Sequence, residues 1–176
     1  MVFTMQDLKI DLIKRFLKTE SFKHDPVNKF RLSSGIESEF YVDCKTLTGD
    51  PIARNLLARY AFDKIKNLHF GCIGGLEIGA IAIGTTISDY ALAQAAKTWP
   101  TFVVRKQVKG HGLGKKIEGI TIGTEALIVD DVLTSGGSVL QAVDAARQNG
   151  LTVKYALVIV DRQEQDGKKN LEKNGV

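Results

Sequence analysis

Cysteine and long apolar stretches are both scarce in this sequence of 176 residues. Its two cysteines, Cys44 and Cys72, are too few for a disulfide framework or a zinc site, and we expect free thiols in a reducing cytosol. No apolar run approaches the ~18 residues that a membrane-spanning helix needs. Residues 1–11 carry several charged side chains and no apolar core. We therefore expect a cytoplasmic protein with neither a signal peptide nor a membrane partner.

Acidic residues are absent from one short segment, residues 105–116, which is rich in basic side chains. These are Arg105, Lys106, Lys109, Lys115 and Lys116. The formal net charge is +4, so the rest of the chain is nearly neutral. A nucleic-acid-binding protein usually spreads its positive charge over a face. Charge gathered in one loop instead suits a compact polyanion such as pyrophosphate, and we expect no nucleic-acid partner.

Apolar periodicity and turn residues divide the chain into alternating helices and strands. We expect an amphipathic helix at residues 5–18, a β-hairpin at 30–45, and a helix from Asp50-Pro51 to about residue 66. The further expected elements are strands at 70–73, 101–106, 125–130 and 153–160, helices at 79–97 and 139–149, and a loop at 107–119.

This alternation, with continuously apolar strands, predicts an α/β fold: a parallel sheet with helices on both faces. The length fits one domain that spans residues 1–176. Within it we expect residues 1–48 to form a small N-terminal helix-and-hairpin hood, and residues 49–176 to form the α/β core.

The most informative segment is an apolar run followed by Asp130-Asp131 and then by a turn of small residues that opens a helix. The carboxylates are expected at the carboxyl edge of a sheet, where open α/β folds bind ligands. The turn, Thr134-Ser135-Gly136-Gly137-Ser138, offers backbone N–H groups and hydroxyls that suit a phosphate. Acids beside a phosphate turn suit a sugar phosphate, because carboxylates accept hydrogen bonds from ribose hydroxyls. The alternative is a plain strand–turn–helix with capping Thr and Ser.

The glycine pattern of residues 110–115 superficially suggests a nucleotide-binding P-loop. Its spacing is one residue short, and no Ser or Thr follows Lys115, so we reject that interpretation. A glycine-hinged cationic flap that closes over pyrophosphate explains the segment better. The alternative is a basic loop that is simply solvated.

The segment from Ala126 to Ser138 resembles the signature of the type I phosphoribosyltransferases. The basic segment is similar to the mobile catalytic loop of one branch, the orotate phosphoribosyltransferases, with Arg-Lys, then Lys, then His-Gly. The resemblance implies a type I fold and transfer of the phosphoribosyl group from phosphoribosyl pyrophosphate to orotate, giving orotidine 5′-monophosphate and pyrophosphate. It also implies Mg²⁺, and a homodimer in which the flap, residues 105–116, is shared between subunits.

The resemblance also implies a role for individual residues. Catalytic roles fall to Asp131, Lys106, Lys109 and His111. The residues expected to bind phosphoribosyl pyrophosphate are Lys45, Arg105, Lys106, Lys109, His111, Asp130, Asp131, Val132, Leu133, Thr134, Ser135, Gly136, Gly137 and Ser138. Those expected to bind orotate are Phe40, Tyr41, Thr134 and Arg162. Mg²⁺ would arrive with the substrate, and Asp130 or Asp131 is a candidate contact.

Several positions depart from the family pattern. Ser33 stands where a lysine is frequent, Glu37 where a basic residue is frequent, and Gln107 where glutamate is common. These departures bear on affinity for orotate more than on the phosphoribosyl chemistry. Two other functions therefore stay open: a transferase for another base, and a non-catalytic regulator that senses phosphoribosyl pyrophosphate. For Arg162, the alternative to orotate binding is an ion pair with a surface acid.

Overall fold

The computed structural model describes residues 4–31, 35, 37–107 and 116–176. Its helices are α1 (Met5–Lys18), α2 (Cys44–Gly49), α3 (Pro51–Ile65), α4 (Gly79–Ala95), α5 (Gly137–Gln148) and α6 (Gly167–Lys173). Its strands are β1 (Phe22–His24), β2 (Phe30–Arg31), β3 (Glu37–Ser38), β4 (Phe40–Val42), β5 (Cys72–Leu76), β6 (Thr101–Val104), β7 (Ile117–Gly119), β8 (Glu125–Leu133) and β9 (Thr152–Asp161).

The main sheet has the strand order β7-β6-β5-β8-β9 within the described residues. Strand β5 pairs in parallel with β6 and β8, and β8 pairs in parallel with β9. At one edge, β7 pairs antiparallel with β6. The prediction of a mainly parallel α/β sheet is confirmed.

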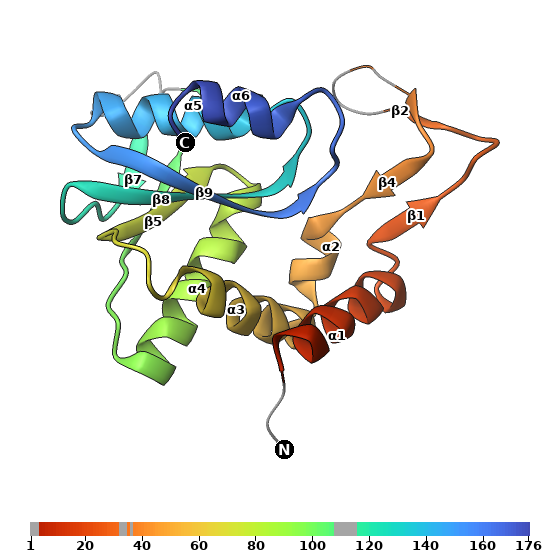
Figure 1. Cartoon of the computed structure of the whole chain (residues 1–176), viewed down its shortest axis with the longest axis horizontal. Coiled ribbons are helices and arrows are strands. Elements are labelled where there is room, and N and C mark those ends of the chain that lie inside the picture. Colours follow the sequence, from red (N-terminus) through yellow and green to blue (C-terminus); the bar gives the residue numbers. More distant parts are fainter. Residues whose placement is uncertain (1–3, 32–34, 36, 108–115) are drawn as a thin grey trace.

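Helices cover both faces of this sheet, as the sequence predicts. In Figure 1, α5 and α6 lie above the sheet, and α3 and α4 lie below it with α1 beside α3. One apolar core gathers residues of α3 and α4 against Ile73, Leu127 and Val129. The other gathers residues of α5 against Ile128 and Val153. No helix of the described chain is both long and apolar enough to cross a bilayer.

Helix starts follow the capping residues in the sequence. At α1, the Thr4 side chain accepts a hydrogen bond from the Asp7 backbone N–H, and the Asp7 carboxylate accepts one from the Thr4 N–H. At α3, the Asp50 carboxylate accepts a hydrogen bond from the Ile52 N–H at 3.1 Å, and Pro51 occupies the first helical position. The two expected helices begin where these caps require.

Two pairs of short strands stand at one end of the sheet, on the right of Figure 1. Strand β2 pairs with β3, which confirms a hairpin in this region, although residues 32–34 of its expected turn lie outside the described residues. Strand β1, which was not predicted, pairs with β4. The hairpin expectation was wrong at its end, because Lys45 belongs to α2, whose start Asp43 caps.

Several other strands and helices differ from the elements expected from the sequence. Strand β5 continues through Gly74-Gly75 to Leu76, because those glycines pair with β6. Strand β8 continues three residues beyond Asp130 to Leu133, so the acid pair lies within the strand rather than at its end. Strand β7 lies inside the expected loop 107–119, and α6 follows β9 where no helix was expected.

Candidate active site

A large, polar cavity of about 670 Å³ lies where β8 ends and α5 begins. It brings together residues that are far apart in the sequence. They are Arg31, Tyr41, Val42, Lys45, Lys106, Asp130, Asp131, Val132, Thr134, Ser135, Gly136, Gly137, Ser138, Val139 and Arg162. Most of the residues expected to bind substrate therefore share one cavity.

The turn from Thr134 to Ser138 has the geometry of an anion site. Gly136 adopts the left-handed conformation (φ +87°), which favours glycine, and α5 begins at Gly137. The free backbone N–H groups of a helix start attract negative charge. Behind the turn, the Asn170 side chain of α6 donates a hydrogen bond to the Ser135 carbonyl at 3.0 Å. The unexpected helix α6 thus supports the turn from outside.

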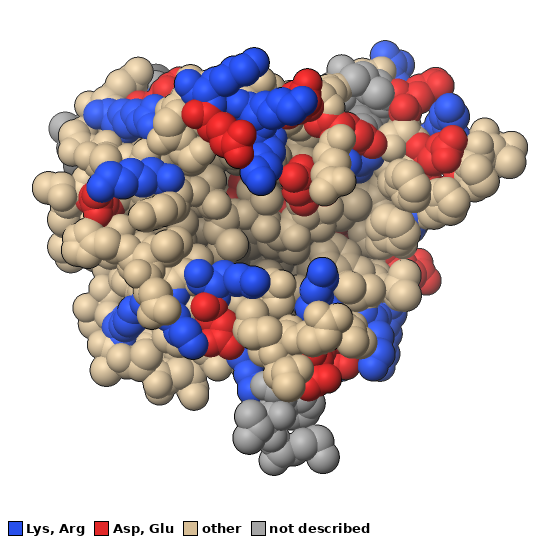
Figure 2. Space-filling model, in the orientation of Figure 1, with Lys and Arg blue, Asp and Glu red and all other residues tan. Residues whose placement is uncertain are grey.

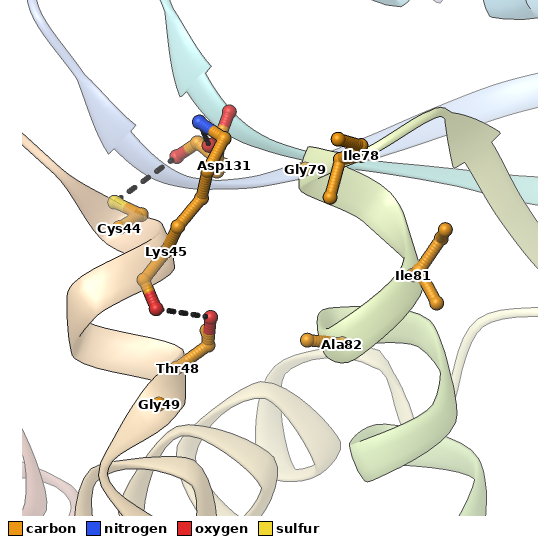
Figure 3. Close-up of a pocket in the computed structure, with 9 residues that line it drawn as sticks. All are labelled: Cys44, Lys45, Thr48, Gly49, Ile78, Gly79, Ile81, Ala82 and Asp131. Carbon is orange, nitrogen blue, oxygen red and sulfur yellow. Dashed lines mark hydrogen bonds and ion pairs between the residues drawn. The ribbon is translucent and has the colours of Figure 1, made fainter.

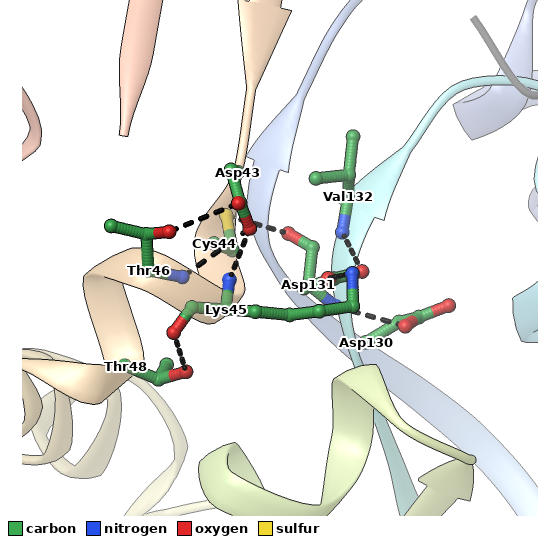
Figure 4. A network of polar contacts seen from close by, with 8 residues as sticks. All are labelled: Asp43, Cys44, Lys45, Thr46, Thr48, Asp130, Asp131 and Val132. Atoms are coloured by element: carbon green, nitrogen blue, oxygen red, sulfur yellow. Dashed lines mark hydrogen bonds and ion pairs between the residues drawn. The ribbon is translucent and has the colours of Figure 1, made fainter. Parts of the chain in front are cut away.

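The two adjacent carboxylates differ in their environment. The Asp130 side chain is buried, with 5% of the residue exposed, and its Oδ1 accepts a hydrogen bond from the Asp131 N–H at 2.9 Å. Burial raises the pKa of Asp130 to about 7, and the neighbouring charge of Asp131 adds to this effect. Asp131 Oδ1 accepts a hydrogen bond from the Val132 N–H at 2.9 Å, as Figure 4 shows.

Gly79, the first residue of α4, lies against both carboxylates. A Cβ atom at this position would come within 2.8 Å of Oδ1 of Asp130 and of Oδ1 of Asp131. Such contacts require the carboxylates to move, so only glycine fits there in the present geometry. Gly79 therefore brings the start of α4 close to the acid pair, where the helix dipole favours negative charge.

Lys45 forms an ion pair with Asp131, with 3.4 Å between Nζ and Oδ2. Figure 3 shows its side chain reaching from α2 toward the end of the sheet. Both residues also line a second, more apolar cavity of about 370 Å³, which includes Cys44, Ile78 and Ile81. Burial raises the pKa of the Cys44 thiol to about 12, so Cys44 is not a nucleophile at neutral pH.

The base of the flap is held by contacts from Glu77, from α5 and from β7. The Lys106 N–H donates to Oε1 of Glu77 at 3.0 Å, and the Lys106 carbonyl accepts from the Gln141 amide at 3.5 Å. The Arg105 guanidinium donates to Glu118 at 2.9 Å, and Arg105 is absent from the residues that line the cavity. Lys109 and His111 lie outside the described residues. Of the expected flap cations, Lys106 thus lines the cavity.

Of the residues expected to bind orotate, some line the cavity and one does not. Tyr41, Thr134 and Arg162 line the cavity, whereas the Phe40 ring stacks on His24 with centroids 4.7 Å apart. Leu133, expected at the phosphate site, is buried in the apolar core instead. Arg162 also makes the ion pair that was the alternative to orotate binding, with Glu164 at 2.9 Å. Both interpretations of Arg162 are compatible with this geometry.

Some residues of the site were not expected from the sequence. Arg31, Val42 and Val139 line the cavity. Arg31 lies in the expected hairpin, but nothing in the local pattern shows which side of the hairpin faces the sheet. Glu77 and Gln141 act through the backbone of a distant segment, and no local motif indicates such a contact.

Comparisons with known proteins show relatives of this chain. No family model matches the chain. It is 38% identical to the orotate phosphoribosyltransferase of Aquifex aeolicus over 170 residues, which covers 96% of this chain and 92% of that protein. Its structure is similar to that of the Mycobacterium tuberculosis orotate phosphoribosyltransferase, with a TM-score of 0.75, 30% identity, and coverage of 95% and 91% of the two chains. A structure of that enzyme in complex with phosphoribosyl pyrophosphate matches with a TM-score of 0.65 and 27% identity, covering 76% and 75% of the chains.

Proposed function

The chain belongs to the orotate phosphoribosyltransferase family, and we propose that it uses the residues of the large cavity to make orotidine 5′-monophosphate and pyrophosphate from orotate and phosphoribosyl pyrophosphate. One observation carries this proposal. The turn proposed to bind phosphate, a pair of carboxylates and the base of the cationic segment line the same cavity. These three features match the three parts of phosphoribosyl pyrophosphate: the 5′-phosphate, the ribose and the pyrophosphate.

The turn from Thr134 to Ser138 would hold the 5′-phosphate at the start of α5. Asp130 and Asp131 would then accept hydrogen bonds from the ribose hydroxyls. When the bond from C1 to pyrophosphate breaks, positive charge develops on the ribose, and nearby carboxylates stabilise it. N1 of orotate then loses its proton and forms a bond to C1 as the bond from C1 to pyrophosphate breaks.

The cations stabilise the departing pyrophosphate. Lys45 and Lys106 line the cavity, and Arg105, Lys109 and His111 belong to the same flap segment. Negative charge grows on the bridging oxygen as it leaves, so these groups bind the transition state more tightly than the ground state. His111 or a flap lysine is the proposed proton donor to that oxygen.

Mg²⁺ is the proposed cofactor. The described residues contain no group of three or more His, Cys, Asp or Glu side chains that would hold a metal ion by itself. The carboxylate oxygens of Asp130 and Asp131 are the kind of ligand that Mg²⁺ prefers, so they fit a metal that enters with the diphosphate. Asp131 is the better candidate of the two, because its side chain is 17% exposed. When bound, the ion would neutralise charge on the diphosphate.

The reaction is tested by mixing the protein with phosphoribosyl pyrophosphate and Mg²⁺ and following the loss of orotate absorbance. Parallel reactions with uracil, adenine and hypoxanthine test the alternative bases. We expect turnover with orotate alone. Turnover with another base, or binding of phosphoribosyl pyrophosphate without turnover of any base, would refute the proposed substrate.

We also infer a homodimer whose flap, residues 105–116, closes over the neighbouring subunit's cavity, and activity in the cytoplasm. Exposed Ile78 and Ile81 beside the second cavity offer apolar surface for a subunit contact. Mixing inactive Lys109→Ala and Asp131→Asn variants tests the shared site. Random exchange into a closed dimer restores roughly a quarter of the wild-type activity, because each mixed dimer has one intact site. Activity that stays at the level of the separate variants, despite proven exchange, would refute the shared flap.

A further inference from the structure

Arg162 joins the sheet to the short strands beside the cavity. Its backbone N–H donates to the Leu133 carbonyl at 3.0 Å, which fixes it to the end of β8. Its Nη2 donates to Oγ of Ser38 at 2.8 Å and to the Phe40 carbonyl at 3.1 Å. Ser38 ends β3 and Phe40 begins β4. One guanidinium therefore connects the core to both strand pairs of the hood.

Glu164 contacts the same guanidinium and shares Nη2 with Ser38 and Phe40. Its Oε2 accepts a hydrogen bond from Nε of Arg162 at 2.9 Å, and its Oε1 accepts one from Nη2 at 3.2 Å. The same Oε1 also accepts a hydrogen bond from Oγ of Ser38 at 3.3 Å. Glu164, Arg162 and Ser38 thus form a closed triangle of contacts. A bidentate pair of this kind fixes the plane of the guanidinium as well as its position.

The burial of Arg162 explains why an acid is needed there. Its side chain is 6% exposed, and an isolated charge at that depth is costly. The Glu164 side chain is 35% exposed, so the carboxylate can stay ionised as the counter-charge. The hydrogen bond from Arg162 lowers the pKa of Glu164, which supports the same conclusion.

The contacts use only one edge of the guanidinium. Nε and Nη2 make the hydrogen bonds to Glu164, Ser38 and the Phe40 carbonyl, and within the described residues Nη1 makes none. Arg162 also lines the large cavity. The N–H groups of Nη1 are therefore the part of Arg162 left to bind a ligand.

We propose that Glu164 is a positioning residue that, together with Ser38, holds Arg162 so that its Nη1 faces the base. Orotate then binds well only when the hood, through Ser38 and Phe40, is in contact with Arg162. This proposal rests on the proposed function, because it takes orotate as the base that Arg162 binds. It assigns the ion pair and the substrate contact to different edges of one side chain. The two interpretations of Arg162 then no longer compete.

Glu164→Ala tests the proposal through two independent measurements. We expect the KM for orotate to rise roughly tenfold, since a hydrogen bond to a charged group contributes enough for a change of this size. The KM for phosphoribosyl pyrophosphate and the kcat at saturating orotate should change less than about twofold. Amide hydrogen exchange of residues 37–42 should become faster, because the hood loses its link to the core.

Matched variants separate positioning from a general loss of stability. Glu164→Gln keeps an oxygen acceptor and should restore part of the orotate affinity. Ser38→Ala should raise the KM for orotate in the same way, and the double variant should be little worse than Glu164→Ala, because both act on one triangle. Glu172→Ala is the control. It removes an acid of α6 that pairs with Lys168 at 3.9 Å and takes no part in the contacts of Arg162, so it should change neither KM.

Equal rises in both KM values would mean that Glu164 only stabilises the fold, and an unchanged orotate KM would also overturn the proposal. If the wild-type protein fails to use orotate, the proposed function is wrong. In that case the exchange comparison still decides whether Glu164 fastens the hood: unchanged exchange of residues 37–42 in Glu164→Ala would refute this link.

Discussion

Asp130→Asn should stabilise the ligand-free protein above neutral pH while impairing its activity. Asp130 is 5% exposed, and burial raises its pKa to about 7 from its ordinary value of 3.8. The folded state therefore binds the Asp130 proton more tightly than the unfolded state does. Asparagine resembles the protonated acid in shape, and its side-chain oxygen can still accept the hydrogen bond that the Asp131 N–H donates.

The sign and size of the effect follow from proton linkage. Below about pH 4, Asp130 is protonated in both states and its contribution to the free energy of unfolding is constant. Between that pH and about 7 the unfolded state releases the proton and the folded state keeps it, so the stability of the wild type falls as the pH rises. The total loss is on the order of 4 kcal/mol. Asparagine has no proton to lose, so the variant should lack this decline.

Urea unfolding of the ligand-free proteins at pH 5 and pH 8 measures the effect. Trp99 is the chain's one tryptophan and is 7% exposed in the core, so its fluorescence reports unfolding. The variant's advantage over the wild type should grow by roughly 3 kcal/mol between these pH values. Asp144→Asn on the exposed face of α5 is the control and should change stability by less than about 0.5 kcal/mol at either pH. An advantage that does not grow with pH would refute the assignment of a raised pKa to Asp130.

Three further substitutions test other parts of the cavity. Gly79→Ala should lower turnover roughly 100-fold, because its Cβ would displace both carboxylates; near-normal turnover in the orotate absorbance assay would contradict this. Lys45→Met should raise the KM for phosphoribosyl pyrophosphate roughly tenfold and leave that for orotate unchanged, and an equal rise in both would argue against its place beside the pyrophosphate. Gly137→Val should keep the fold, since the nearest atom to a Cβ there is 3.7 Å away, but calorimetry should detect no binding of phosphoribosyl pyrophosphate.

Features that depend on neighbouring residues in the sequence could be predicted. The Thr4 and Asp50 caps mark the starts of α1 and α3, and the turn after β8 opens α5 where its glycines indicate. Each of these signals acts over a few residues, through hydrogen bonds to the nearest backbone groups. The turn expected to bind phosphate is also local, since residues 134–138 are consecutive and line one cavity.

Features that depend on contacts between distant residues could not be predicted in the same way. The end of β8 is set by pairing with β9, so Asp130-Asp131 lies inside a strand although the acids read as its end. The two acids also differ in burial, which their shared sequence context does not reveal. Helix α6 and the contacts of Glu77 and Gln141 support the site from elements that are remote in the sequence.

On the face shown in Figure 2, acidic and basic side chains are interspersed rather than gathered by sign. The cavity also holds charges of both signs, but it places two acids next to each other. Asp130 and Asp131 lie side by side although their charges repel, and burial makes the ionised form of Asp130 costly. Selection for stability alone would favour asparagine at that position, because it fills the same space without a charge. An acid retained there at the expense of stability is understandable if a substrate supplies the missing positive charge, as a ribose does when pyrophosphate leaves it. The expected gain in stability and loss of activity of Asp130→Asn thus have one physical cause.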